Sequence, residues 1–262
     1  MNHTATLNSG LTSRKESLDY LRENHPDVPY FISEWGNTLH GPINITACFG
    51  SALWALDLDL AAMVRGVARI AHTQGPWSAK ALWIPEPLDS GVNEGPAQAR
   101  AVFAATPVVA DFIGREKNPG KVVELDVEGQ DLMSAYAMYS GGCSGALAKV
   151  ALINMKVWNQ GDEEERGAST FVLPVEGLED GTEVLVKRFV AEAGAGALGF
   201  DVDGPEGNVT WAGEQWSKKV GNGKGHFVNG HGEDVDTVEV EDGVVEVKVR
   251  DSEAAIIYLA HK

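Results

Sequence analysis

The sequence predicts an α/β segment followed by an all-β segment, divided near Gly114. Two observations favour this fold class. Residues 1–115 alternate between helix and strand patterns, whereas the later residues form short β-rich runs separated by turn residues. A third observation is the charge, because residues 1–115 carry −3 and residues 116–262 carry −14 of the formal net charge of −17. We therefore expect two domains, 1–115 and 116–262.

The first helix–strand pair is expected before residue 34. Ser13 and Glu16 have the S-x-x-E spacing of a capping box, which predicts that a helix begins there. Pro26 and Pro29 end this helix, because proline interrupts helical hydrogen bonding. The apolar run 30–32 that follows predicts a strand.

The second helix–strand pair follows the same order. Residues 47–64 are apolar on almost every side, which predicts a buried helix, and the run 67–70 predicts a second strand. Two such pairs imply a parallel sheet, because parallel strands are joined by crossover helices. A further helix is expected over 97–112, kinked at Pro107.

The second segment shows an all-β pattern that suggests a β-sandwich. Asp242-Gly243 has the residue types of a tight type I′ turn and predicts a hairpin over 237–249. The charged run 162–166 is most simply a solvated hairpin tip, since it lacks the ligand spacing of calcium sites. The expected strands are 122–127, 132–139, 146–155, 169–175, 182–190, 237–240, 244–249 and 255–259.

Composition excludes several classes of partner. A net charge of −17 argues against nucleic acid or an anionic membrane as a partner, because both require clustered cations. Cys48 and Cys143 have neither CxxC nor histidine spacing, so no metal site or cofactor is indicated. The first 14 residues show no export signal, and no apolar stretch is long enough to cross a bilayer. A neutral or polymeric substrate fits the composition better.

Glu34 is the strongest catalytic candidate on physical grounds. It lies at the end of the first expected strand, where parallel barrels place catalytic groups, and Trp35 beside it offers a face on which a sugar ring can stack. The second strand is followed by the polar segment 71–75, which can supply hydrogen bonds to the same pocket. Two alternatives stay open for Glu34, namely a helix cap and an ion pair with Arg69.

Several motifs carry a family resemblance. They are Tyr30-Phe-Ile-Ser-Glu-Trp-Gly-Asn37, Cys48-Phe-Gly-Ser-Ala-Leu-Trp54, His72-Thr-Gln-Gly75, Trp83-Ile-Pro85, Val108-Val-Ala-Asp-Phe-Ile-Gly114 and Ser252-Glu-Ala254. Their order and spacing resemble the C-terminal half of glycoside hydrolase family 79, which includes β-glucuronidases and heparanase. The resemblance implies a partial (β/α)8 barrel, of which this chain holds the last two strands and their helices, followed by a C-terminal β-sandwich.

The resemblance also implies an activity and a set of site residues. The family hydrolyses glucuronide-bearing carbohydrate with retention of configuration, and Glu34 stands at the position of its nucleophile. The full-length parent is expected to be extracellular. The substrate-binding residues implied are Trp35, Asn37, His72, Gln74, Gly75 and Trp77. His72 and Gln74 have an equally good alternative as strand-end groups bonded to neighbouring loops, and the position of Trp77 is shifted from that of the family's aromatic residue.

The acid/base residue of the family has no counterpart in this sequence. A retaining glycosidase needs a second carboxyl group, which in the family precedes the nucleophile by about a hundred residues, whereas only 33 residues precede Glu34. The pair Asn93-Glu94 follows Glu34 and is interpreted as a solvated turn. We therefore expect a truncated gene model or C-terminal fragment, inactive alone. The alternative is a non-catalytic carbohydrate-binding or interaction protein built on the β-sandwich.

Overall fold

The computed structural model describes residues 1–37, 43–75, 77–91, 94–115, 120–128, 131–141 and 145–259. Asn93 and Cys143, both named in the sequence analysis, lie outside these residues. The α-helices are α1 (His3–Thr6), α2 (Lys15–Asn24), α3 (Ile43–Thr46), α4 (Phe49–Val64) and α5 (Ala105–Ile113). Other helical turns are η1 (Leu7–Leu11), η2 (Thr12–Arg14), η3 (Ala101–Ala104), η4 (Pro205–Gly207) and η5 (Gly221–Gly223).

Strands dominate the later part of the chain. The strands before residue 100 are β1 (Tyr30–Trp35), β2 (Val67–His72), β3 (Trp83–Ile84) and β4 (Gln98–Ala99). Eight longer strands follow: β5 (Lys121–Leu125), β6 (Met133–Tyr139), β7 (Leu147–Asn154), β8 (Ala168–Pro174), β9 (Glu183–Ala191), β13 (Val235–Glu239), β14 (Val244–Arg250) and β15 (Glu253–Tyr258). Three short strands are β10 (Val209–Trp211), β11 (Glu214–Gln215) and β12 (His226–Phe227).

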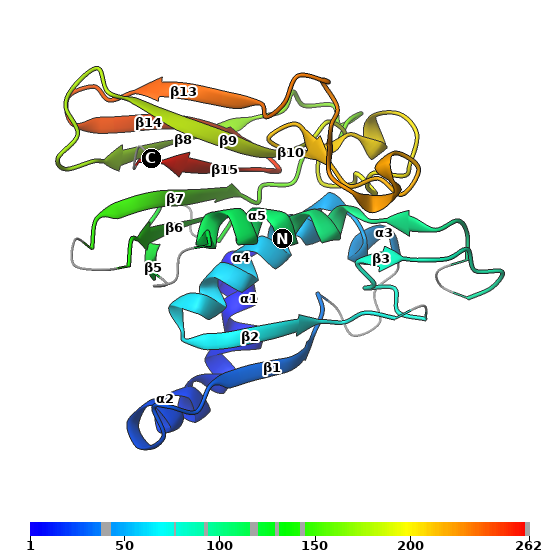
Figure 1. The fold of residues 1–262 in the computed structure, drawn as a ribbon, viewed down its shortest axis with the longest axis horizontal. Coiled ribbons are helices and arrows are strands. Elements are labelled where there is room, and N and C mark those ends of the chain that lie inside the picture. The colour runs from blue at the N-terminus through cyan, green and yellow to red at the C-terminus, as the bar shows by residue number, and fades with distance from the viewer. Residues whose placement is uncertain are drawn as a thin grey trace.

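The elements form layers (Figure 1). The pair β1–β2 lies at one side of the molecule, helices α4 and α5 lie above it, and the large sheet with β8 and β14 lies beyond the helices. Within the described residues, no helix combines the length and apolar character needed to span a bilayer.

The parallel pairing expected for the first segment is confirmed. β1 pairs with β2 in parallel, with Tyr30 opposite Val67 and Trp35 opposite His72. Helix α4 connects them through a crossover, as parallel strands require. The buried helix expected over 47–64 is also confirmed as α4, which packs against α5, η3 and β5.

The capping box expected at Ser13 and Glu16 is wrong. Helical turns already run from His3 to Arg14, so α2 has no free N-terminus that needs a side-chain cap. Ser13 instead donates its hydroxyl to the carbonyl of Gly10. The helix ends at Asn24, just before Pro26, as the sequence predicted.

The helix expected over 97–112 begins later than predicted. Gln98 and Ala99 form β4 and pair with β3, and the extended Arg100 donates its backbone N–H to the carbonyl of Leu82. Pro107 therefore lies in the first turn of α5, where its missing N–H leaves no interior hydrogen bond broken. The helical turn η3 runs directly into α5 before Pro107, and the kink at Pro107 stays a prediction.

All eight β-rich runs expected after residue 120 form strands. Most of them join one sheet of the order β12-β11-β10-β9-β15-β7-β6-β5, to which β13 adds by pairing with β9. β14 and β8 form a separate antiparallel pair. The two-residue strands β11 and β12 and the three-residue β10 escaped prediction, because so few residues carry no periodic pattern.

The central strands of the large sheet are buried on both faces. One face packs against α4 and α5 in a core that includes Phe49 and Phe189, and the other face packs against β8 and β14 around Phe171 and Val247. Neighbouring residues of each strand point to opposite cores. Such neighbours are Ala135 and Tyr136, Leu152 and Ile153, and Ile256 and Ile257. Burial on both faces explains the continuous apolar runs in these strands.

The expected hairpin over 237–249 is only half present. Asp242 and Gly243 have φ angles of 50° and 73°, as a type I′ turn requires. The flanking strands separate after the bridge between Glu241 and Val244, because β13 pairs with β9 whereas β14 pairs with β8. The turn thus carries the chain from one sheet to the other.

The charged run 162–166 is an exposed loop rather than a hairpin tip. It connects β7 and β8, which pair with other strands. Residues 162–165 are exposed, but Arg166 turns inward and donates to the carbonyls of Ala191, Asp251 and Ser252. The prediction of a hairpin is therefore wrong, and the prediction of solvated charges holds for the four acidic residues.

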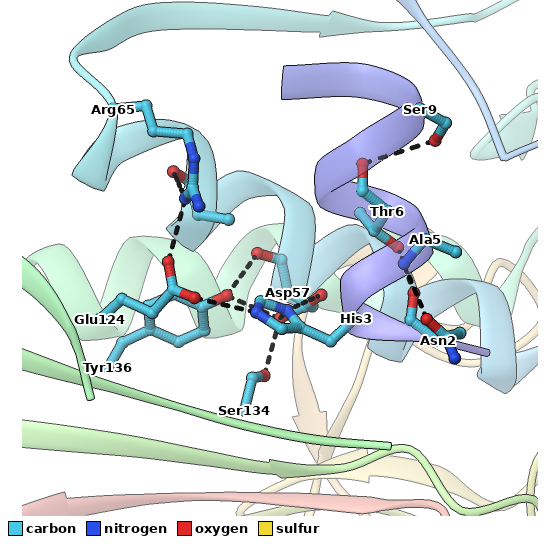
Figure 2. A network of polar contacts seen from close by, with 11 residues as sticks. Asn2, His3, Ala5, Thr6, Ser9, Asp57, Arg65, Glu124, Ser134 and Tyr136 are labelled. Atoms are coloured by element: carbon cyan, nitrogen blue, oxygen red, sulfur yellow. Dashed lines mark hydrogen bonds and ion pairs between the residues drawn. The ribbon is translucent and has the colours of Figure 1, made fainter. Parts of the chain in front are cut away.

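A buried ionic network joins the first helix to the sheet (Figure 2). The ring of His3 lies between two carboxylates, with Nδ1 2.9 Å from Asp57 and Nε2 2.9 Å from Glu124. Both ring nitrogens can donate only in the imidazolium form. Burial of the ring works against this charge, but the two carboxylates outweigh it and raise the pKa of His3 to about 9.

The carboxylate of Asp57 is fully buried and well satisfied. Ser134 donates its hydroxyl to Asp57 at 2.7 Å, and Tyr136 donates at 2.6 Å. Burial and the nearby Asp57 raise the pKa of Tyr136 well above its ordinary value, so the phenol stays a donor. Arg65 completes the network through Glu124 at 3.0 Å. The network therefore fixes α1 and α4 to β5 and β6 by charge as well as by packing.

We predict a pH-dependent contribution of His3 to stability. Because the pKa of His3 is higher in the folded than in the unfolded chain, its contribution is complete below about pH 6.5 and is lost as the pH rises to about 9. The difference in unfolding free energy between the wild type and His3→Gln should therefore shrink by roughly 3 kcal/mol across this range. Urea unfolding at several pH values measures it. The exposed His231→Gln is the control, and a difference that is constant with pH would contradict the prediction.

A second prediction concerns the core shared by the helices and the sheet. Phe49 is fully buried and packs edge to face against Phe189 of β9, with the two ring centroids 4.7 Å apart. Phe49→Ala should destabilise the chain by about 3–5 kcal/mol and lower the protection of β9 amides in hydrogen exchange. Phe31→Ala, at a side chain that is 52% exposed, should cost less than about 1 kcal/mol. Unchanged protection in β9 would show that the two layers unfold independently.

Candidate active site

The candidate site lies where β1 and β2 end. Trp35 and His72 are register partners, and Thr73 donates both its N–H and its hydroxyl to the carbonyl of Trp35, at 2.9 and 3.0 Å. The carboxyl ends of the two strands therefore lie side by side. This is the edge at which parallel α/β sheets place their functional groups.

Glu34 is exposed at this edge. The hydroxyl of Thr73 lies 3.4 Å from its Oε1, and the single proton of this hydroxyl can go either to Glu34 or to the nearer carbonyl of Trp35. Neither alternative proposed for Glu34 is seen in the described part of the chain. Arg69 lies over the ring of Phe31 at 5.2 Å and forms no ion pair with Glu34, and no helix N-terminus receives its carboxylate.

A small pocket opens at Trp35, the residue after Glu34, and Glu34 itself is not part of its lining. Its lining includes Trp35, Asn37, Trp54, His72, Lys80 and Leu82. Its volume of about 10 Å³ is enough for roughly one water molecule, so a single ligand atom can enter while the rest of a ligand stays outside. Three of the residues predicted from the sequence are thus brought together here.

His72 is held in the pocket wall by an ion pair. Its Nε2 lies 3.0 Å from Oδ1 of Asp59 on α4, and both side chains are mostly buried. Burial lowers the pKa of His72, but the hydrogen bond and charge of Asp59 outweigh this effect and raise the pKa above its ordinary value. The pair favours an imidazolium whose charge is already matched.

The side-chain amide of Asn37 has a hydrogen-bond partner at its nitrogen and none, among the described residues, at its oxygen. Its Nδ2 donates to the hydroxyl of Ser51, which in turn donates to the carbonyl of Ile45 at 2.5 Å. Because Ser51 uses its proton in this way, the orientation of the Asn37 amide is fixed. The Oδ1 atom of Asn37 is buried and has no hydrogen-bond partner among the described residues. A buried acceptor of this kind calls for a donor from a ligand or a water.

Gln74 and Trp77 do not line the pocket. Gln74 donates to the carbonyl of Trp83 and accepts from the N–H of Leu82, both at 2.8 Å, which is the contact expected of a strand-end group bonded to a neighbouring loop. Trp77 is 67% exposed and its ring lies against Gly91. Gly75 lies between them and is likewise not part of the lining.

Sequence reasoning missed three residues at this site. Lys80 and Trp54 line the pocket, and Asp59 pairs with His72. Asp59 had a usable signal, since a charged residue that interrupts an apolar helix needs a partner. Lys80 had none, because its loop has no recognisable motif. In the described part of the chain, no group of three or more His, Cys, Asp or Glu side chains gathers as a metal site would.

Comparison with known proteins identifies a family model and a relative that this chain resembles. Residues 135–256 match the model of the glycosyl hydrolase family 79 C-terminal beta domain. A β-glucuronidase of Aspergillus niger is 26% identical over 274 residues, which cover 99% of this chain and 47% of that protein.

Solved structures show the same fold. A 4-O-α-L-rhamnosyl-β-D-glucuronidase from Fusarium oxysporum superposes with a TM-score of 0.73 at 22% identity, over 98% of this chain and 48% of that one. CelM2, a bifunctional glucanase-xylanase from a metagenome library, superposes with a TM-score of 0.51 at 12% identity, over 94% of this chain and 33% of that one. The chain spans about half the length of the two glucuronidases. The resemblance to glycoside hydrolase family 79 is thus confirmed, and residues 135–256 carry the C-terminal beta domain of that family.

Proposed function

We propose that this chain is the C-terminal part of a retaining β-glucuronidase-like glycoside hydrolase, with Glu34 as its nucleophile. The observation that supports this most is the position of Glu34, exposed at the carboxyl end of a parallel strand and next in the chain to Trp35, which lines the pocket together with His72. The match to the β-glucuronidase of Aspergillus niger supports a glucuronide-bearing carbohydrate as the substrate.

The exposed face of β1–β2 supports a partial barrel as the fold of residues 1–115. Parallel strands are normally buried on both faces, yet Phe31 on β1 is 52% exposed and Arg69 on β2 is exposed beside it. Among the described residues this sheet has two strands, and further strands would cover this face and its edges. We therefore propose that residues 1–115 are the last two strands and helices of a (β/α)8 barrel and that residues 116–262 form a β-sandwich domain.

The proposed mechanism is a double displacement. The carboxylate of Glu34 attacks the anomeric carbon and forms a glycosyl ester, while the bond to the leaving group breaks. A second carboxyl group must protonate the leaving oxygen and later activate water. Among the described residues, the one hydrogen-bond partner of the Glu34 side chain is the hydroxyl of Thr73, which also has the carbonyl of Trp35 as an acceptor and is no acid at neutral pH.

We predict that the chain alone hydrolyses unactivated aryl β-glucuronides no faster than buffer. Protonation of the leaving group by a positioned acid typically accelerates such a reaction 10²–10⁴-fold, and this acceleration is absent when the acid is missing. The substrate carries a phenol that is a poor leaving group, and the rate of its release is measured by chromatography. Turnover that disappears in Glu34→Ala would contradict the prediction and identify a second carboxyl group of this chain as the acid.

A glycosyl fluoride tests the nucleophile itself, because fluoride leaves without protonation. We predict that 2-deoxy-2-fluoro-β-D-glucuronosyl fluoride forms a stable ester with Glu34, found by peptide mass spectrometry. Glu34→Gln should take no label, and Glu94→Gln, at an exposed turn, should be labelled like the wild type. A label on any other residue would disprove this role for Glu34. Glycan binding without any label would favour the non-catalytic carbohydrate-binding alternative.

A further inference from the structure

Lys80 crosses directly over the residue that follows Trp35. A Cβ atom built at Gly36 would lie 2.2 Å from Cδ and 3.1 Å from Nζ of Lys80, so the Lys80 side chain lies directly against the backbone of Gly36. The Lys80 side chain therefore lies in the wall of the pocket, against Gly36, which is two residues after Glu34 in the chain.

The backbone on both sides of Lys80 is held firmly. Arg100 is 1% exposed, and its guanidinium donates to the carbonyls of Ala79 and Ala81 at 3.1 and 3.2 Å. Burial lowers the pKa of Arg100 to about 10, which still leaves it charged at neutral pH. Thr46 donates its hydroxyl to the same carbonyl of Ala79 at 2.6 Å. These bonds fix the point from which the Lys80 side chain starts.

Lys80 and His72 line the same pocket, but among the described residues only His72 has a counter-charge. His72 has Asp59 as a counter-charge, whereas no carboxylate of the described residues lies within ion-pair distance of Lys80. A half-buried cation without a counter-charge attracts an anion into the pocket. Asn37 lines the same pocket, and its buried Oδ1, which has no hydrogen-bond partner among the described residues, can accept a hydrogen bond from a hydroxyl group that enters the pocket.

We propose that Lys80 and Asn37 form a subsite for a uronic acid, in which the ammonium binds the sugar carboxylate and the amide oxygen accepts the neighbouring hydroxyl. This inference rests on the proposed glucuronidase function and adds the residues that read the acid group. A neutral hexoside offers the hydroxyl but not the carboxylate, and charge-assisted hydrogen bonds are stronger than neutral ones. Lys80 therefore determines specificity, while Arg100 positions it.

The experiment compares three ligands on the whole chain: methyl β-D-glucuronide, its neutral methyl ester and methyl β-D-glucoside. Affinities are measured by ligand-observed NMR. The wild type should bind the glucuronide about tenfold more tightly than either neutral ligand. Acylation of Lys80 by N-hydroxysuccinimidyl acetate, followed by mass spectrometry, should be slowed by the glucuronide and not by the glucoside. The exposed Lys121 should react at the same rate with every ligand.

Variants then separate charge from folding. Lys80→Gln should bring the ratio of the affinities for glucuronide and glucoside close to one, whereas Lys80→Arg and the control Lys121→Gln should keep the preference for the acid. Tight glucuronide binding that Lys80→Gln leaves unchanged would overturn the role of Lys80 and leave the proposed function standing. A wild type that binds none of the three ligands would overturn the subsite, whereas the proposed function is decided separately by the labelling of Glu34 with the glycosyl fluoride.

Discussion

The burial of the central sheet on both faces is the constraint on which the rest of the molecule depends. Ile153 and Leu152 are neighbours in β7, yet they contribute to different cores. A shift of one residue in the register would exchange these contributions and place each side chain in the wrong core. The register of β6, β7 and β15 is therefore fixed by packing from two directions, and it fixes in turn the surface on which α4 and α5 lie.

Helix α4 connects the central sheet to the candidate site through two of its acidic residues. Its Asp57 is bound by Ser134 and Tyr136 of β6 and by His3, while its Asp59 binds His72 at the end of β2. The side chains of residues i and i+2 point in different directions on a helix, so two acidic residues of one turn reach two different layers. The same helix that joins the sheet to the N-terminal helical turns thus also orients a wall of the pocket.

The sequence was sufficient for those features that depend on local patterns. The eight longer strands, the parallel β1–β2 pair and the apolar α4 follow from residue types and their periodicity. Because the carboxyl ends of parallel strands meet at one edge, the sequence also predicted that Trp35 and His72 lie close together. Features that depend on distant partners were not accessible. Ser13 looked like a cap because nothing in its neighbourhood reveals that residues 3–14 are already helical. The separation of β13 from β14 is decided by β9 and β8, which compete as pairing partners and are distant in the chain.

The loop that carries Lys80 is anchored through its backbone, and this has a consequence for how such a pocket can change. Arg100 and Thr46 bind carbonyl oxygens of residues 79 and 81, which every amino acid possesses. Substitutions at position 80 therefore leave the anchoring bonds in place, and the charge presented to the pocket can be exchanged without redesigning the loop. Under the proposed role of Lys80, the preference for an acidic or a neutral sugar can change in evolution at this one position while the fold that supports it stays constant.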